Sequence, residues 1–485
     1  MEYTRGCEHP QEACGVVGVY APGSDVARVA FFGLYALQHR GQESAGIATA
    51  DGTGIRIHTA MGLVGQAFHE RDLEHLTGHI AIGHTRYSTT GSNRPQNAQP
   101  VLVKGPEIEL ALGHNGNVVN AAPLRKTLEE WGAGFSASTD SEVIAQMLAW
   151  APGRGWQERL AYAMRQLQGA YSLVILTKDT LLGCRDPLGV RPLCLGRLGE
   201  GGWVMASESC ALDHVGAQYL REVEPGETVL IDQSGLTSIP PAVDTSRRAL
   251  CVFEHIYFAR PDSVLDGKLV HQARQAMGAQ LAREHPVEAD IVIGVPDSAT
   301  AAAVGYARAS SIPYAEGLIK NRYVGRTFIQ PDQRLRDLGV QMKFNPLPEV
   351  LWGKRVVVVD DSIVRGTTTP HVVNLLRRAG ALEVHLRVCA PPIRHPCPLG
   401  VDMATMRELI AAGRTVEEVR QFIGADSLGY LSVKGLHRAV GGSSQGFCNA
   451  CFTGNYPIPV QLELDKLALE VEEPSTTQPT HIPGR

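Results

Sequence analysis

Hydrophobic and polar positions follow two different patterns along this 485-residue chain, and the first covers residues 14–246. Short apolar runs of strand length recur there, separated by polar and glycine-rich stretches. They predict strands at 14–20, 55–59, 79–84, 109–112, 171–177, 204–206 and 228–231. Helical periodicity predicts helices at 26–39, 141–151 and 156–168, the second capped by Asp140 or Ser141. Many short strands with few helices indicate an α+β domain of packed sheets covered by helices.

From about residue 267 the pattern changes to alternating helices and strands. We expect helices at 268–284, 300–309 and 369–379, and strands at 290–295, 355–360 and 383–390. This order is typical of βαβ units and a parallel sheet, which makes the second half an α/β domain. The proline pair at 240–241 and the polar residues up to 246 suit a linker. We therefore divide the chain into domains at 14–246 and 247–460.

The most informative stretch is residues 356–369, where four valines lead into two adjacent carboxylates, Asp360 and Asp361. An uninterrupted apolar run predicts a strand buried on both faces, and a ligand is expected at the carboxyl end of such a strand. Hydroxyls and backbone amides in 362–369 suit a phosphate, and the paired acids suit ribose hydroxyls or Mg²⁺. The alternative is a buried strand followed by an acidic helix cap. It is disfavoured because two buried acids without a partner are costly.

Composition narrows the range of functions. The 45 basic and 50 acidic residues give a net charge of −5, which does not favour general binding to nucleic acid or to an anionic membrane. The first ten residues lack the apolar core of a secretory signal, and no apolar run reaches the length of a membrane span. We therefore expect a cytoplasmic protein with reduced cysteines. The last residues, 470–485, are polar and proline-bearing, and we expect 461–485 to be a mobile tail.

The segment at 356–369 resembles the 5-phosphoribosyl-1-pyrophosphate (PRPP) motif of type I phosphoribosyltransferases. The resemblance implies that Asp360 and Asp361 face the ribose and its Mg²⁺, with Ser298 as a further ligand of the metal. It also implies that the basic stretch 320–331 is a mobile loop that closes on PRPP. A helix start at Ser298 and a solvated charge run at 320–331 are the alternatives. The PRPP contacts expected are Asp360, Asp361, Ser362, Arg365, Gly366, Thr367, Thr368, Lys320 and Arg322.

Cys14 opens the first predicted strand, where a cysteine is by itself most often a small core residue. Four segments downstream change that interpretation: QHRGQESAG at 38–46, HTRYST at 84–89, GHNGN at 113–117 and TDSE at 139–142. Together they resemble the motifs of the class II glutamine amidotransferases. The resemblance covers residues 14–246 and implies an N-terminal nucleophile fold, in which helices enclose two sheets in an αββα sandwich.

This second resemblance also implies roles for individual residues. Cys14 would attack glutamine once residues 1–13, a propeptide, are removed and its α-amine is free to act as the base. Asn115 (side chain) and Gly116 (backbone N–H) would stabilise the oxyanion. Arg86 would bind the carboxylate of glutamine and Asp140 its ammonium group. The alternatives are a hairpin turn at Asn-Gly, a surface ion pair for Arg86 and a helix cap for Asp140.

A C-x-x-C pair, Cys448 and Cys451, indicates metal or redox chemistry in the second half. Cys251 and Cys397 are candidates to complete a four-cysteine site, which fits Zn²⁺ or a [4Fe–4S] cluster equally well by count. The two domains together resemble the amidophosphoribosyltransferase family. One branch of that family holds a [4Fe–4S] cluster with cysteines in these four contexts. Unligated thiols are the remaining alternative.

The combined resemblance implies an enzyme that makes 5-phosphoribosylamine, pyrophosphate and glutamate from glutamine, PRPP and water. Ammonia would pass internally between the two sites, and the stretch 254–263 would lie between them. Purine nucleotides would inhibit, with Lys343 and the 320–331 loop as contacts, and the chain would form a homotetramer or homodimer. The rivals are a sugar-phosphate aminating enzyme and a non-enzymatic iron–sulfur regulator that binds nucleotides.

Overall fold

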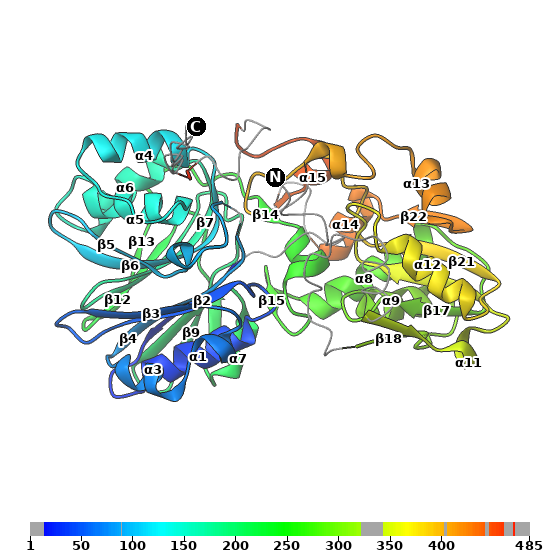
Figure 1. Ribbon diagram of the computed structural model, residues 1–485, viewed down its shortest axis with the longest axis horizontal. Coiled ribbons are helices and arrows are strands. Elements are labelled where there is room, and N and C mark those ends of the chain that lie inside the picture. Colours follow the sequence, from blue (N-terminus) through cyan, green and yellow to red (C-terminus); the bar gives the residue numbers. More distant parts are fainter. Residues whose placement is uncertain are drawn as a thin grey trace, which may run out of the picture.

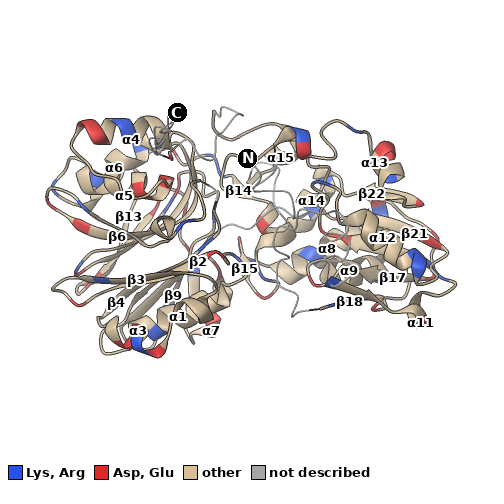
Figure 2. Ribbon diagram, in the orientation of Figure 1, with Lys and Arg blue, Asp and Glu red and all other residues tan. Residues whose placement is uncertain are grey.

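The computed structural model describes residues 14–88, 90–321, 343–401, 405–441, 446–459 and 469–470. The described chain forms two lobes that lie side by side (Figure 1). The first lobe runs from β1 to β13, and the second runs from β14 to residue 459. Acidic and basic residues are interspersed over both lobes (Figure 2), in keeping with the small net charge of −5.

Two antiparallel sheets form the centre of the first lobe. One sheet has the strand order β11-β9-β10-β1-β4-β2-β3 and the other the order β13-β12-β8-β7-β6-β5. The first contains β1 (Gly15–Tyr20), β2 (Ser44–Ala50), β3 (Ile55–Met61), β4 (Ile80–Arg86), β9 (Cys194–Leu198), β10 (Gly202–Ala206) and β11 (Gln218–Glu222). The second contains β5 (Val101–Lys104), β6 (Glu109–Val118), β7 (Gly169–Leu176), β8 (Leu181–Arg185), β12 (Thr228–Asp232) and β13 (Gly235–Ile239).

Alternating side chains bury both faces of these sheets. In β1, Val17 and Val19 pack toward α1 (Val26–Ala36) and α7 (Ser209–His214), whereas Val16 packs between the two sheets. The outer face of the second sheet is covered by α4 (Ala121–Glu130), α5 (Asp140–Trp150) and α6 (Trp156–Gln166). Short helices complete the lobe: α2 (Val64–Ala67), α3 (Glu70–His75) and a 3-10 turn, η1 (Pro95–Asn97). The αββα sandwich expected from the sequence is confirmed.

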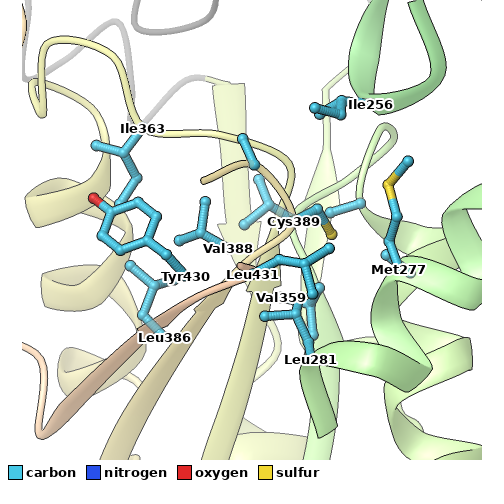
Figure 3. Packing of buried hydrophobic residues seen from close by; sticks show 14 of the residues in the cluster. Ile256, Met277, Leu281, Val359, Ile363, Leu386, Val388, Cys389, Tyr430 and Leu431 are labelled. Atoms are coloured by element: carbon cyan, nitrogen blue, oxygen red, sulfur yellow. The ribbon is translucent and has the colours of Figure 1, made fainter. Parts of the chain in front are cut away.

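The second lobe contains the expected parallel sheet, with strands in the order β17-β20-β21-β22. These are β17 (Ile291–Gly294), β20 (Arg355–Asp360), β21 (Glu383–Val388) and β22 (Ser427–Tyr430). Helices cover both faces: α8 (Val270–Glu284), α9 (Thr300–Ser310), α12 (Thr369–Arg378), α13 (Val416–Ile423) and α14 (Val433–Val440). Figure 3 shows Val359 of β20 and Val388 of β21 in the same core as Met277 and Leu281 of α8.

Smaller elements connect and extend this lobe. They are β14 (Leu250–Cys251), the π-helix η2 (Glu254–Phe258), β15 (Val264–Leu265), β16 (Lys268–Leu269), β18 (Leu318–Lys320), β19 (Phe344–Pro346), α11 (Pro348–Leu351), η3 (Met406–Glu408), β23 (Phe447–Cys448) and α15 (Ala450–Thr453). In the part of the chain that the structure describes, no helix has both the length and the apolar character needed to cross a bilayer.

Several local expectations were wrong. Asn115 and Gly116 lie inside β6, which continues to Val118, so Asn-Gly is not a hairpin turn. Helix α5 begins at Asp140 and is capped by Thr139, whose hydroxyl accepts the N–H of Glu142. The remaining expected strands and helices are present, with boundaries shifted by a few residues.

Two residues of the expected tail are docked on the first lobe. Leu469 is buried among the side chains of that lobe, and a carboxylate oxygen of Glu470 accepts the N–H of Ser92 and the hydroxyl of Ser138. For these two residues the prediction of mobility was therefore wrong, because an apolar contact and a paired carboxylate hold them in place. The rest of 461–485 lies outside the described residues.

Candidate active sites

Four of the five predicted amidotransferase residues line one cavity at the edge of the two sheets, and the fifth, Asn115, lies beside it in β6. Cys14 directly precedes β1, Arg86 ends β4, Gly116 lies in β6, and Asp140 begins α5. Because β1 and β4 are neighbours, residues at their adjacent ends lie close together. The cavity is lined by Cys14, Arg86, Tyr87, Thr90, Gln99, His114, Gly116, Thr139, Asp140 and Ser141.

The thiol of Cys14 is buried and held on the backbone of Tyr87. Its Sγ lies 3.2 Å from the carbonyl oxygen of Tyr87, to which it donates, and 3.4 Å from the N–H of the same residue. Burial raises the pKa of the Cys14 thiol to about 11, against the smaller opposing effects of the Tyr87 backbone and Arg86. The thiol is therefore neutral near pH 7, and nucleophilic attack requires a nearby base.

Asn115 and Gly116 have the features of an oxyanion site. Asn115 is fully buried, and neither its Nδ2 nor its Oδ1 has a hydrogen-bond partner among the described residues. An unpartnered buried amide is costly, which is a reason to expect that a ligand completes it. Gly116 has a φ of +150°, and a Cβ at this position would lie 2.0 Å from the carbonyl oxygen of Ala170. Only glycine fits there without displacing β7.

Arg86 and Asp140 both line the cavity, and both are buried. The guanidinium group of Arg86 makes two long hydrogen bonds of 3.3 Å, to the carbonyls of Ser92 and Thr90, and the carboxylate of Glu43 lies 3.9 Å away. Asp140 accepts the N–H of Val118 at 2.9 Å. Arg86 is therefore not part of a surface ion pair, and Asp140 is not a simple helix cap. A buried cation and a buried anion in one cavity match the two charged groups of a free amino acid.

His114 is a cavity residue that sequence reasoning missed as a functional group. Its Nδ1 lies 3.1 Å from the hydroxyl of Ser141 and 3.7 Å from the carboxylate of Asp140. Burial lowers the pKa of His114, although Asp140 acts in the opposite direction, so the ring is neutral near pH 7. Its place beside Asn115 in the GHNGN segment was the available signal.

The predicted PRPP residues gather at the carboxyl end of the parallel sheet. Asp360 ends β20, and Asp360 and Asp361 are only 5% and 1% exposed. The hydroxyls of Ser298 and Ser362 both donate to Asp361, the second at 2.6 Å. Because Ser298 follows β17, this bond joins the turns after two neighbouring strands. Such a position is where open α/β sheets bind their ligands.

The turn after Asp361 leads into the N-terminus of α12. Gly366 has a φ of +69°, and a Cβ there would lie 2.3 Å from Cδ1 of Ile410, so this turn requires glycine. Thr367 is exposed and Thr368 half-buried, immediately before α12 begins at Thr369. Arg365 lies 3.9 Å from the carboxylate of Glu408. The free N–H groups of the helix start are suited to a phosphate.

The basic stretch at 320–331 is described only at its beginning. Lys320 ends β18, and its ammonium group donates to Asp297 at 3.1 Å, beside Ser298. It therefore lies on the same side of the sheet as the carboxylate pair. Arg322 and the remainder of the predicted loop lie outside the described residues. Lys343 is described and lies over the ring of Phe344, 5.3 Å from its centroid.

The four predicted cluster cysteines come together from three segments. Parallel pairing of β14 with β23 sets Cys251 beside Cys448. Residues 394 and 395 both donate their N–H groups to the carbonyl of Cys451, which brings the segment of Cys397 to the same place. Burial raises the pKa of the Cys451 thiol, and Cys251, Cys397 and Cys448 raise it further, so all four thiols are within electrostatic reach. In the described ranges, no group of three or more His, Cys, Asp or Glu side chains has the geometry to hold a single metal ion.

Two family models match this chain. One describes a glutamine amidotransferase domain and covers residues 84–214, and the other describes a phosphoribosyl transferase domain and covers residues 262–421. A curated amidophosphoribosyltransferase of Synechococcus elongatus is 52% identical over 470 residues, which are 96% of this chain and 95% of that protein. Another, of Mycobacterium tuberculosis, is 50% identical over 475 residues, covering 95% of this chain and 90% of the relative.

This chain belongs to the amidophosphoribosyltransferase family. A solved structure of the glutamine PRPP amidotransferase of B. subtilis, complexed with ADP and GMP, matches with a TM-score of 0.88 and 46% identity. The match covers 94% of this chain and all of that one. The family assignment makes the chain a transferase that joins an amidotransferase domain to a phosphoribosyltransferase domain. Cys14 and three of the four cluster cysteines fall outside the two family models, so their assignment depends on the geometry above.

Proposed function

We propose that this chain converts PRPP, glutamine and water into 5-phosphoribosylamine, pyrophosphate and glutamate, as the first committed step of purine nucleotide synthesis in the cytoplasm. One observation carries the proposal: a nucleophile, a buried cation and a buried anion share one cavity in the first domain. The second domain of the same chain presents a carboxylate pair at the end of a parallel strand. Ammonia released at the first site is the nucleophile that the second site consumes.

In the first half-reaction the Cys14 sulfur attacks the amide carbon of glutamine. The freed α-amine of Cys14 takes the thiol proton and then gives it to the departing ammonia. Asn115 and the N–H of Gly116 stabilise the oxyanion of each tetrahedral intermediate. Water then attacks the glutamyl thioester, which regenerates the thiol and releases glutamate. Arg86 and Asp140 orient glutamine through its carboxylate and its ammonium group.

In the second half-reaction ammonia attacks C1 of PRPP, and the bond from C1 to the pyrophosphate oxygen breaks. Asp360 and Asp361 bind the ribose hydroxyls, and the 362–368 turn holds the 5-phosphate. Mg²⁺ would be held by Ser298, Asp360 and Asp361, a set of oxygen donors of the kind that this ion prefers, and would neutralise charge on pyrophosphate. Lys320 and Arg322 supply further positive charge. An internal path keeps ammonia unprotonated and therefore nucleophilic.

Removal of residues 1–13 is part of this proposal. While residue 13 is attached, the nitrogen of Cys14 is an amide and cannot accept the thiol proton. The neutral, buried thiol then has no base, so the unprocessed chain has no glutaminase activity. Mass spectrometry of the active enzyme should show an N-terminus at Cys14. Full glutaminase activity in protein that still begins at Met1 would contradict the proposal.

The four gathered cysteines support a [4Fe–4S] cluster held by Cys251, Cys397, Cys448 and Cys451. Four cysteine thiolates are the usual ligand set of such a cluster. Pairing of β14 with β23, and the two N–H groups that the carbonyl of Cys451 accepts, bring four thiols together from three segments. The group would supply a cross-link between β14, β23 and the segment of Cys397.

We expect the Cys451→Ser variant to lose the cluster. Purified anaerobically, it should contain less than about a quarter of the wild-type iron and acid-labile sulfide, because a serine hydroxyl is a poor ligand for this cluster. Its melting temperature should fall by about 5 °C or more, since a metal-linked cross-link is lost. Cys389→Ser is the matched control, because Cys389 is also a buried cysteine of this domain. Unchanged iron content in Cys451→Ser would contradict the assignment.

The proposed reaction is tested by measuring glutamate and pyrophosphate release from glutamine, Mg²⁺ and PRPP. At saturating PRPP both products should form in equal amounts, whereas without PRPP no pyrophosphate should form and glutamate release should be much slower. A sugar-phosphate aminating enzyme would release glutamate with a hexose phosphate instead. An iron–sulfur regulator would bind PRPP or nucleotides without turnover, so the absence of pyrophosphate release would favour it.

We further propose that purine nucleotides inhibit this chain at or beside the PRPP site, and that it assembles as a homotetramer or homodimer. The structural relative complexed with ADP and GMP supports nucleotide binding. Lys343, next to β19 at the edge of this site, is the contact we propose among the described residues. Competition between GMP and PRPP in the pyrophosphate assay is the direct measurement.

A further inference from the structure

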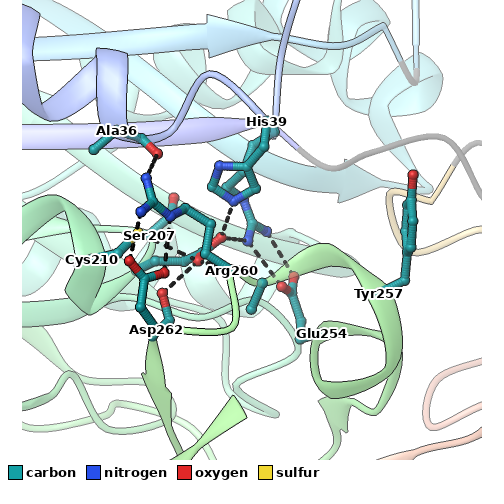
Figure 4. A network of polar contacts seen from close by, with 12 residues as sticks. Ala36, His39, Ser207, Cys210, Glu254, Tyr257, Arg260 and Asp262 are labelled. Atoms are coloured by element: carbon teal, nitrogen blue, oxygen red, sulfur yellow. Dashed lines mark hydrogen bonds and ion pairs between the residues drawn. The ribbon is translucent and has the colours of Figure 1, made fainter. Parts of the chain in front are cut away.

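A buried ion-pair network lies between the two domains, outside the set of residues that line the cavity at Cys14. At its centre is Glu254, which begins the π-helix η2 and is fully buried. Its carboxylate accepts two hydrogen bonds from Arg40, at 2.8 and 2.9 Å, and a third from Arg191 at 3.3 Å. Figure 4 shows the carboxylate of Glu254 facing a guanidinium group beside His39, with dashed lines between the two groups.

Each of the two arginines also holds a backbone carbonyl at the glutaminase site. The Nε of Arg40 donates to the carbonyl of Cys14 itself at 3.1 Å. The Nη2 of Arg191 donates to the carbonyl of Leu399 at 3.0 Å. One guanidinium group therefore separates Glu254 from the backbone of the nucleophile.

The segment held by Arg191 packs directly on the proposed oxyanion site. A Cβ on Gly400 would lie 2.7 Å from the carbonyl carbon of Gly116, so the two backbones are in contact. Beside them, Nδ2 of Asn117 donates to the carbonyl of Pro398 at 2.9 Å. Arg191 thus connects Glu254 to the segment of the second domain that packs on β6 at Gly116.

The π-helix that carries Glu254 is fastened to the PRPP domain by Arg274 of α8. The guanidinium group of Arg274 donates to the carbonyls of His255, Tyr257 and Ala259 at 3.0, 2.9 and 2.8 Å. Burial lowers the pKa of Arg274, and the carboxylate of Asp361 is foremost among the groups that oppose this effect. Ile256 of η2 also lies in the same core as Cys389, whose N–H donates to the carbonyl of Asp360 at 2.9 Å, so η2 and the carboxylate pair share one packed core.

The network has little freedom to rearrange without cost. Arg40 is 1% exposed and pairs with both Glu208 and Glu254. Although burial alone would lower the pKa of Arg40, Glu254 and Glu208 raise it above its usual value, so the guanidinium group stays charged. Removing one partner of such a group leaves a buried charge uncompensated, which is far more costly than losing a surface pair.

Building on the proposed function, we propose that Glu254 is a positioning residue that couples the PRPP site to the glutaminase site. It fixes the carbonyl of Cys14 through Arg40 and the Gly400–Gly116 contact through Arg191. Occupation of the site beside Asp361 reaches Glu254 through Arg274 and η2. This chain of contacts has the geometry of a coupling, and measured coupling energies decide whether it acts as one.

The test uses the Glu254→Gln variant of the full-length processed enzyme. Glutamine matches glutamate in size but loses the charge and turns a donor toward the arginines. We expect the PRPP-stimulated glutaminase rate to fall about tenfold to a hundredfold, as for misplaced catalytic groups. The KM for glutamine should rise. Phosphoribosylamine synthesis from PRPP and ammonium should stay within about twofold, because that reaction does not need Cys14.

Glu284→Gln is the matched control, because Glu284 ends α8 and pairs with Ser432 inside the second domain. It should leave both rates unchanged. If Glu254 had only a structural role, Glu254→Gln would lower the glutaminase rate and the ammonium-dependent rate in parallel. The proposal would also be wrong if the variant kept the wild-type ratio of PRPP-stimulated to unstimulated glutaminase rate. Should Glu254→Gln not fold, Arg191→Lys decides, since lysine keeps the charge but cannot hold both acceptors. If the wild-type enzyme did not make phosphoribosylamine from glutamine and PRPP, the proposed function itself would be wrong.

Discussion

Replacing Cys14 with alanine should abolish synthesis of phosphoribosylamine from glutamine and leave synthesis from ammonium nearly intact. Glutamine-dependent activity should fall by about a thousandfold or more, the scale seen when a covalent nucleophile is removed. Ammonium-dependent activity should stay within about twofold, because the PRPP site lies in the other domain. The measurement compares pyrophosphate release with glutamine and with ammonium chloride at saturating PRPP.

The variant is made in a chain that begins at residue 14, so that processing does not confound the result. Cys194→Ala is the matched control, because Cys194 is also a buried strand cysteine whose thiol donates to a carbonyl, that of Ala206. Cys194→Ala should lower the stability of the protein but leave the ratio of glutamine-dependent to ammonium-dependent activity unchanged. A Cys14→Ala enzyme that still used glutamine at the normal rate would show that another group attacks the amide.

The sequence was informative wherever one residue pattern allowed a single physical explanation. Four consecutive valines followed by two acids are compatible with a doubly covered strand that ends at a ligand site, and β20 has this structure. Likewise, Cys14 and three of the four motif segments, which lie between residues 84 and 142, line one cavity because strand ends of one sandwich meet at one edge. The site after β20 follows from the residue pattern itself, whereas the grouping of the other segments came from their resemblance to the class II glutamine amidotransferases.

The sequence was less informative where tertiary contacts override a local preference. Asn-Gly favours a two-residue turn, but in β6 Asn115 and Gly116 pair with Ser172 and Tyr171 of β7, and Gly116 is required by its approach to Ala170. Leu469 lies in the segment that we expected to be a mobile tail, and it is buried among apolar side chains of the first lobe.

The ion pairs between the domains could not have been predicted at all. Arg40 and Glu254 are 214 positions apart, and nothing in either local sequence says that both are buried or that they meet. Charged residues are usually exposed, so a sequence-based expectation places them on the surface. Only the folded arrangement shows that they connect Cys14 to the domain that binds PRPP.

The carboxylate at Asp361 should be needed for both activities, in contrast to Cys14. We expect Asp361→Asn to lower phosphoribosylamine synthesis from glutamine and from ammonium by the same factor, about a hundredfold or more, because a charged ligand of the ribose and its cation is lost. The KM for PRPP should rise. Asparagine keeps the shape of the side chain and one acceptor for Ser298 or Ser362, so the fold should be retained.

A matched control comes from the opposite end of the same sheet. Asp290 precedes β17 and pairs with Arg355 at the end of the strands away from the ligand, where a carboxylate has no role in binding PRPP. Asp290→Asn should leave both activities within about twofold, as for a partly exposed ion pair.

In Asp361→Asn, alkylation of Cys14 by iodoacetamide without PRPP should proceed at the wild-type rate, because the first site is intact. Loss of the glutamine-dependent activity alone would place Asp361 in the coupling between the sites and not in the binding of PRPP.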